Sequence, residues 1–535
     1  MAALTEYTWI PWCCAVVAFF CAFGIGANDV ANAFATSVGS GALSLKAAII
    51  IAAVMEFSGA FLLGGNVATT IMRGITNPDL FVDTPEVLML GMFVVVLCVA
   101  AWLILATVYG LPVSTTHSCI GGLVGMAVVA KGWKAVYWGK VGQVALSWII
   151  TPVISSLLSS FVFWLVRKYV LRSKEPLRRG FQVYPSIIGL TIGINLFLVL
   201  YTSESLDIPL AWYYILLICV AVAVVIGLFV NFAILPRQKR AIEREQNRKE
   251  LELHEKDIVV DVDVVKKTVE VPVTIETVPE VPNESHAAAE STPVTAPSAT
   301  TPEPAKEAAS EAASDVEKEP VKEGAKEHGK ESKFEHLMEK QNIHAELEDE
   351  KSKVYQLHKN AEVFDERTEK LFTYLQIITA IFNSFAHGAN DVANAIGPFA
   401  ACISIYETGV ASPKATPETW CLVLGGAGIV VGLACLGYKV MAAIGVNMVK
   451  VTPSRGFSIE IASSLVVLFG SALGLPLSTT HCKVGSTVGV GLVEGKSGVN
   501  WSLLYGVFAG WIFTLFICAV STGLIYAFAL FSPKL

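Results

Sequence analysis

Four acidic residues are the side chains best placed to do chemistry in this sequence, because they stand inside stretches that are otherwise apolar. They are Asp29, Glu56, Asp391 and Glu460. A carboxylate in the hydrocarbon of a bilayer costs at least about 2.5–3.5 kcal/mol, so such residues usually face a cavity and have a function. We expect Asp29 and Asp391 to bind substrate or ions, and Glu56 and Glu460 to support that site.

The two aspartates lie in identical copies of the motif GANDVANA, at residues 26–33 and 388–395. On a helix, the polar side chains of this motif come within one or two turns of each other, and small neighbours allow close backbone approach. Oxygen ligands of this kind suit a hard cation such as sodium. The motif predicts sodium binding by Asn28, Asp29, Asn32, Asn390, Asp391 and Asn394. The same aspartates would suit a proton-coupled protein, which stays open as the alternative.

A second motif is also repeated, as LPVSTTH at 111–117 and LPLSTTH at 475–481. A proline before Ser and Thr favours a helix start, where hydroxyls and free N–H groups can bind a tetrahedral oxyanion without Arg or Lys. The motif predicts that two half-helices clamp one anion through Ser114, Thr115, Thr116, Ser478, Thr479 and Thr480, together with Asp29 and Asp391. We expect His117 and His481 to be hydrogen-bonding braces rather than metal ligands.

Apolar segments surround these motifs. Of the 535 residues 53% are hydrophobic, and the mean hydropathy is +0.57, which is too apolar for a soluble protein of this length. Scanning for bilayer-length stretches predicts an all-α integral membrane protein with about twelve membrane segments, some of them broken helices or re-entrant hairpins. The first apolar segment follows no basic region, so it is expected to be retained rather than cleaved. The eleven cysteines form no CxxC pair and are expected to be buried free thiols.

The spacing of the motifs indicates an internal duplication. GANDVANA recurs after 362 residues and LPxSTTH after 364 residues, so the two copies keep nearly the same register. We therefore expect four parts: a first repeat at 1–166, two connecting spans at 167–236, a largely disordered linker at 237–370 and a second repeat at 371–535.

Charge predicts the orientation of these parts. Basic clusters follow the first repeat and the two connecting spans, so both belong on the cytoplasmic side by the positive-inside rule. The two repeats then have opposite orientations, with the N- and C-termini outside and the 237–370 loop cytoplasmic. No Arg-rich transit segment precedes the first span, which favours the plasma membrane over an organelle.

The paired GANDVANA and LPxSTTH motifs resemble those of the inorganic phosphate transporter family of the PiT type. The resemblance covers both repeats, and it implies sodium-coupled phosphate uptake by alternating access, a homodimer, and phosphate and ion ligands drawn from Asn28, Asp29, Asn390, Asp391 and the two Ser-Thr-Thr triplets. It also implies that Glu56 and Glu460 are functionally important. No cofactor is expected beyond co-transported sodium or, in its place, protons.

Other functions are weighed against this one. An intramembrane aspartyl protease would use two aspartates, but it leaves the STTH pair unexplained, so no enzymatic activity is expected. A channel would need a symmetric pore rather than an anion clamp between inverted halves. Sulfate is the serious competing substrate, although hydrogen phosphate can donate a hydrogen bond to Asp29 or Asp391. The expected mechanism is symport in which sodium binds first and neutralises these aspartates before phosphate enters. No nucleic-acid partner is expected.

Overall fold

The fold is known from a computed structural model, which describes residues 4–202, 209–245, 247–248, 347, 349–411 and 417–532. The chain divides into one unit of residues 1–244 with 338–535 and a second unit of residues 245–337. The first unit holds all the elements below. The described part is helical and contains no strand, only an isolated bridge between Thr76 and Val136. Most of the predicted linker, 237–370, falls outside the described residues, but its last residues, 349–370, are described and partly helical.

The helices of the first copy and of the two connecting spans lie along the apolar stretches of the sequence. They are α1 (Trp9–Asn28), α2 (Val30–Gly39), α3 (Leu45–Gly74), α4 (Pro85–Val108), α5 (Thr115–Lys131), α6 (Trp138–Val166), α7 (Pro176–Thr202) and α8 (Trp212–Phe229). Asp29 stands at the break between α1 and α2, so the first GANDVANA motif spans two helices.

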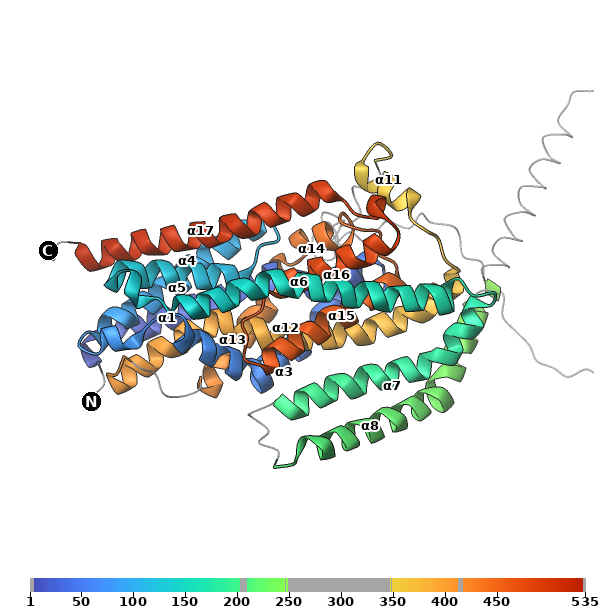
Figure 1. Cartoon of the computed structure of the whole chain (residues 1–535), viewed down its shortest axis with the longest axis horizontal. Coiled ribbons are helices and arrows are strands. Elements are labelled where there is room, and N and C mark those ends of the chain that lie inside the picture. The colour runs from blue at the N-terminus through green and yellow to red at the C-terminus, as the bar shows by residue number, and fades with distance from the viewer. Residues whose placement is uncertain are drawn as a thin grey trace, which may run out of the picture. The chain divides into compact units, whose positions relative to one another are not determined.

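The second copy repeats this order after the linker. The helix α11 (Lys353–Asn360) falls within the predicted linker and precedes this copy. The helices of the copy are α12 (Glu366–Thr408), α13 (Thr419–Leu436), α14 (Tyr438–Gly445), α15 (Pro453–Ala472), α16 (Thr479–Val493) and α17 (Trp501–Phe531). Here the GANDVANA motif lies inside the unbroken helix α12. The described chain begins and ends at one end of the helix bundle, whereas α8 ends and α11 begins at the other (Figure 1).

The two copies interlock through equivalent pairs of helices. Within each copy, the helix that leads into or contains GANDVANA packs on the helix before the STTH loop: α1 packs on α4, and α12 packs on α15. Between copies, α1 packs on α13 as α12 packs on α3, and α5 packs on α17 as α16 packs on α6. The motif glycines permit these crossings: a Cβ on Gly26 would lie 1.8 Å from the carbonyl oxygen of Ile429, and one on Gly388 would lie 2.2 Å from that of Glu56.

Nine helices of the described chain are long and apolar enough to cross a membrane. The half-helices α5 and α16, with 17 and 15 residues, are not among them. At 1.5 Å per residue they extend only about 25 and 22 Å, less than the roughly 30 Å of a bilayer core. Apolar blocks therefore outnumber candidate spans. All eleven cysteines are free thiols, as predicted; nine are buried, whereas Cys13 and Cys435 are exposed, contrary to the prediction.

Candidate functional site

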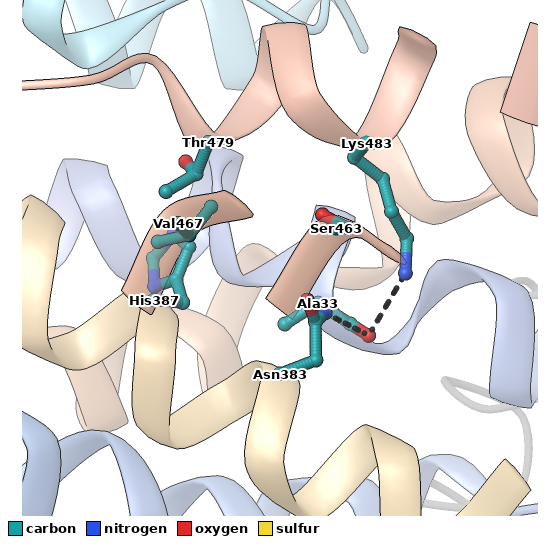
Figure 2. A pocket seen from close by; sticks show the side chains of 7 residues that line it. All are labelled: Ala33, Asn383, His387, Ser463, Val467, Thr479 and Lys483. Atoms are coloured by element: carbon teal, nitrogen blue, oxygen red, sulfur yellow. Dashed lines mark hydrogen bonds between the residues drawn. The ribbon is translucent and has the colours of Figure 1, made fainter. Parts of the chain in front are cut away.

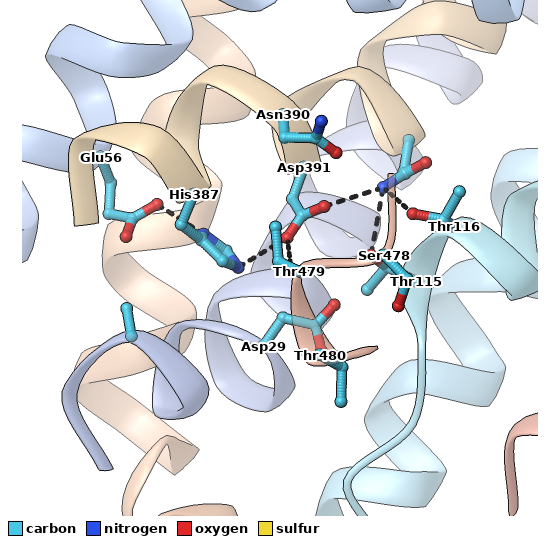
Figure 3. Close-up of polar contacts among 12 residues, drawn as sticks. Asp29, Glu56, Thr115, Thr116, His387, Asn390, Asp391, Ser478, Thr479 and Thr480 are labelled. Carbon is cyan, nitrogen blue, oxygen red and sulfur yellow. Dashed lines mark hydrogen bonds and ion pairs between the residues drawn. The ribbon is translucent and has the colours of Figure 1, made fainter. Parts of the chain in front are cut away.

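The two STTH motifs meet end to end at the centre of the first unit. Ser114 and Ser478 are the N-caps of α5 and α16, and each hydroxyl accepts a hydrogen bond from the backbone N–H three residues later, at 3.3 Å. The two serine hydroxyls also bond to each other at 2.9 Å. Two helix N-termini thus meet at one serine pair. Figure 3 shows Thr115 and Thr116 of one motif near Ser478 and Thr479 of the other.

The loops that lead into α5 and α16 exchange a second pair of contacts. The hydroxyl of Thr116 donates to the carbonyl of Leu477 at 2.8 Å, and that of Thr480 donates to the carbonyl of Val113 at 3.3 Å. These four residues hold equivalent places in the two copies. Each half-helix is therefore held in place by the loop of the other copy.

The two motif asparagines that precede the aspartates hold the same loops. Asn28 donates to the carbonyl of Leu111 at 2.9 Å and accepts from the N–H of Val113 at 3.0 Å. In the second copy Asn390 donates to the carbonyl of Leu475 at 3.4 Å, in the loop before α16, and it also bonds to Ser471 at the end of α15 at 3.0 Å. Both amides are buried. Their hydrogen bonds tie the GANDVANA segments to the helix starts, a contact between motifs that spacing alone did not suggest.

The two aspartates lie directly beside the helix starts. Asp29 is 1% exposed and Asp391 is 0% exposed. Thr480 donates to Asp29 at 2.9 Å, and Thr479 donates to Asp391 at 2.5 Å. Since the threonines come from α16 while Asp29 follows α1 and Asp391 lies on α12, the site combines both copies. It thereby brings together the predicted carboxylates and hydroxyls.

Asn394 links the hydroxyls of the first Ser-Thr-Thr triplet to Asp391. Its amide lies 3.1 Å from the hydroxyl of Thr115, 3.4 Å from that of Thr116 and 3.4 Å from a carboxylate oxygen of Asp391. Asn394 therefore contacts both an expected anion ligand and an expected cation ligand. The side chain of Asn32, its counterpart in the first copy, lies outside the described part of the structure.

The sequence analysis missed His387, which connects two of the buried acids. Its Nδ1 lies 2.8 Å from Glu56 and its Nε2 lies 2.7 Å from Asp391 (Figure 3). Ligand atoms of Asp29, His387 and Asp391 all lie within 4.8 Å of one another, a grouping that could hold a cation. The signal in the sequence was a difference between the two copies: a histidine directly precedes the second GANDVANA motif, where the first copy has Ile25.

His117 and His481 lie at the core of an aromatic stack. Their rings are parallel to within 9°, with centroids 4.7 Å apart, and each stacks on a tryptophan: His117 on Trp148 and His481 on Trp511. Each Nδ1 bonds to its N-cap serine, at 2.7 Å and 2.5 Å. This geometry is that of a brace behind the helix starts, and the two tryptophans were not predicted.

Glu460 lies in a separate polar cluster. One carboxylate oxygen accepts from the hydroxyls of Thr36 and Ser37 at 2.6 Å, and the other accepts from Thr379 at 2.9 Å. The amide of Gln376 donates a further bond at 3.2 Å. The donors come from α2 and α12, so this carboxylate also joins the two copies. It lies outside the grouping of Asp29, His387 and Asp391.

Comparisons with known proteins show what this chain is similar to. The model of the phosphate transporter family matches residues 25–522. Sodium-dependent phosphate transporter 1 of Mus musculus is 31% identical over 94% of this chain and 92% of its own. Sodium-dependent phosphate transporter 1-B of Xenopus laevis is 31% identical over 92% of each chain. A solved structure described as the sodium-dependent phosphate transporter is similar with a TM-score of 0.69 and 28% identity, over 98% of this chain and all of its own.

Proposed function

Since this chain belongs to the phosphate transporter family, we propose that it is a secondary active symporter that imports inorganic phosphate together with sodium ions. It is an integral membrane protein, with nine candidate spans in its described part. Sodium enters the proposal because relatives that match over most of their length are named sodium-dependent phosphate transporters. We assign no enzymatic activity to its buried aspartates.

The facing N-termini of α5 and α16 carry the proposal for phosphate. Two helix starts joined by the Ser114–Ser478 contact offer hydroxyls, backbone N–H groups and two positive dipole ends to one anion. In the proposed complex, phosphate takes over hydrogen bonds that the two Ser-Thr-Thr triplets now make with each other. No Arg or Lys is needed at that point.

The grouping of Asp29, His387 and Asp391 supports the proposal for sodium. Two buried carboxylates beside an anion site would repel phosphate in a medium of low dielectric constant. Sodium bound there first would remove this repulsion, so we propose ordered binding, sodium before phosphate. Asn394, which contacts Asp391 and Thr115, would then couple the cation and anion positions.

The selectivity for phosphate over sulfate would come from the same carboxylates. Hydrogen phosphate carries a proton that it can donate to an acceptor such as Asp29 or Asp391, whereas sulfate carries none at neutral pH. An acceptor left unsatisfied by sulfate costs about 1–3 kcal/mol, or about five- to 150-fold in affinity. Equal inhibition of phosphate uptake by sulfate and by unlabelled phosphate would contradict this part of the proposal.

Alternating access would use the interlocked copies as inverted repeats. Support comes from the equivalent helix pairs between copies and from helix starts that face each other. In this proposal the repeats are 1–166 and 371–535, residues 167–236 connect them, and the 237–370 loop is cytoplasmic with both termini outside. The homodimer stays a prediction of the resemblance, and the plasma-membrane location stays a prediction of the sequence.

The decisive experiment is radiolabelled phosphate uptake by the full chain in proteoliposomes under an imposed sodium or proton gradient. We expect an inward sodium gradient to drive accumulation and a proton gradient to have little effect. Accumulation of phosphate under the proton gradient alone would show that protons, and not sodium ions, are the coupling ion. Flux that does not saturate with phosphate would refute a carrier.

A further inference from the structure

A lysine is buried in the same region, on the second turn of α16. Lys483 is 1% exposed, and its ammonium lies 3.5 Å from the carbonyl oxygen of Ala33. That oxygen also accepts a hydrogen bond from the amide of Asn383 at 3.1 Å (Figure 2). Lys483 lines a small cavity together with His387 and Thr479, of about the size of one water molecule.

Glu460 is the acidic group that contacts the same stretch of α2 as this lysine. Thr36 and Ser37, which donate to its carboxylate, follow Ala33 by about one helical turn, and the two charges interact electrostatically. Both side chains are almost completely buried. Buried charges are kept only when an opposite charge and hydrogen bonds compensate them. Glu460 has the four donors described above, and Lys483 has the carbonyl of Ala33, so the pair is compensated within the protein.

These two opposite charges exist in only one of the two copies. At the register of the LPxSTTH motifs, Cys119 stands in place of Lys483 and Val96 in place of Glu460. The duplicated frame therefore folds without a charge pair at this position. A buried pair is often no more stabilising than apolar residues of similar size, so stability alone does not explain it.

We propose that the ammonium of Lys483 is a tethered cation, which holds the place beside Glu460 that a sodium ion would otherwise take. The inference rests on the proposed sodium–phosphate symport and deepens it. The position has the ligands that sodium prefers: the Ala33 carbonyl, the hydroxyl of Ser463 in the cavity wall and the carboxylate of Glu460 close by. A single positive charge on α16 fills it without leaving the protein.

The consequence is a limit on how many sodium ions accompany each phosphate. An ion that binds and leaves adds its charge to the transport cycle, whereas a tethered ammonium returns with the empty carrier. Glu460 is thus neutralised in every state, and exchangeable cations are confined to the grouping of Asp29, His387 and Asp391. Lys483 acts as a positioning residue that sets coupling and not as a phosphate ligand.

The test replaces the lysine by an uncharged side chain of similar length, Lys483→Met, in full-length protein reconstituted in proteoliposomes. Glu460 then lacks its fixed counter-charge and should recruit sodium from solution. We expect the number of sodium ions per phosphate, measured from reversal potentials, to rise by about one. The half-saturating sodium concentration for phosphate uptake should rise several-fold.

Two further variants separate this outcome from a merely structural role. Lys483→Arg keeps the charge and should keep the wild-type stoichiometry. The double variant Lys483→Met with Glu460→Gln removes both charges and should return the stoichiometry to the wild-type value, even if its maximal rate is lower. The double variant also decides the question if Lys483→Met alone does not fold.

Opposite results overturn the inference. One is a Lys483→Met protein that transports more slowly with unchanged stoichiometry, and another is a double variant that carries an extra sodium ion. Failure of the proposed function would differ from both, because wild-type protein would then show no sodium-driven phosphate uptake in the same vesicles.

Discussion

Removal of the N-cap hydroxyls tests the anion site most directly. Ser478→Ala and Ser114→Ala each delete a hydroxyl that caps a half-helix and bonds to the opposite serine at 2.9 Å. If this hydroxyl binds phosphate, its loss removes a hydrogen bond to a charged group, worth about 1.5 kcal/mol at the low end of the usual range. That corresponds to a rise of about tenfold in the half-saturating phosphate concentration.

The same substitutions also affect stability, and the two effects can be separated. Loss of an N-cap costs about 1 kcal/mol, and loss of the bond to His117 or His481 leaves a buried imidazole nitrogen short of a partner, at about 1–3 kcal/mol. The unfolding temperature should therefore fall in both variants. Because the serines share one hydrogen bond, the double variant should lose less stability than the sum of the single variants.

Ser118→Ala is the matched control on the same helix. Ser118 is buried on α5, but its hydroxyl donates to the carbonyl of Ser114 at 3.0 Å within the helix and contacts the thiol of Cys518, and neither group belongs to the expected anion site. Cys482 replaces it in the second copy. We expect its half-saturating phosphate concentration to stay within about twofold of the wild-type value. Phosphate dependence that changes equally little in Ser114→Ala and Ser478→Ala, measured as initial uptake rates, would refute an anion site at the helix starts.

Three further predictions concern other parts of the structure. Gly388→Ala should prevent folding, because its Cβ would lie 2.2 Å from a carbonyl oxygen, whereas Gly65→Ala has no atom within 4 Å and should fold; yields of folded protein from size-exclusion chromatography compare them. His387→Leu removes the imidazole between Glu56 and Asp391 and should lower stability by about 3–5 kcal/mol, so an unchanged unfolding temperature would count against the linkage. Glu362 lies between α11 and α12, outside the candidate spans. Burial alone would raise the pKa of its carboxyl group, but hydrogen bonds from Arg172 and Arg167 hold this pKa below its ordinary value of 4.5. Wild-type protein should therefore exceed Glu362→Gln in stability by about 1 kcal/mol at neutral pH, and this difference should disappear only as the pH falls below 4.5, as thermal unfolding over pH would reveal.

The repeated motifs made the central part of the site predictable. Two motifs that recur at one register must occupy equivalent places, so the approach of Asp29 and Asp391 to the Ser-Thr-Thr triplets followed from the sequence. His387 and Lys483 could not be found in that way, because neither recurs. The roles of Asn28 and Asn390 as ties to the helix starts depend on loop geometry, which the spacing does not contain.

Membrane segments were harder to count than to detect, for a physical reason. Apolar composition identified the stretches, but α5 and α16 stop short of a bilayer thickness because each begins at a capped, polar loop in the protein interior. The helix α12 is long enough, yet it carries the polar motif and the buried His387, so it is too polar to be found by composition among the nine candidate spans of the described chain.

The distribution of charge between the copies connects the site to its proposed coupling. Contacts that recur in both copies are neutral: a serine pair, hydroxyls on carbonyls, stacked imidazoles. Of the charged groups that occur once, His387, Glu460 and Lys483 lie in the second copy, and Glu56, which pairs with His387, lies in the first. An anion clamp benefits from two equal halves, because a tetrahedral ion accepts donors from both sides. The number of coupled cations gains nothing from two equal halves, because each cation site that is added, or filled by a fixed charge, changes the stoichiometry by one. The duplicated frame would then provide the phosphate site, and the charged residues that occur in one copy only would set how many sodium ions accompany it.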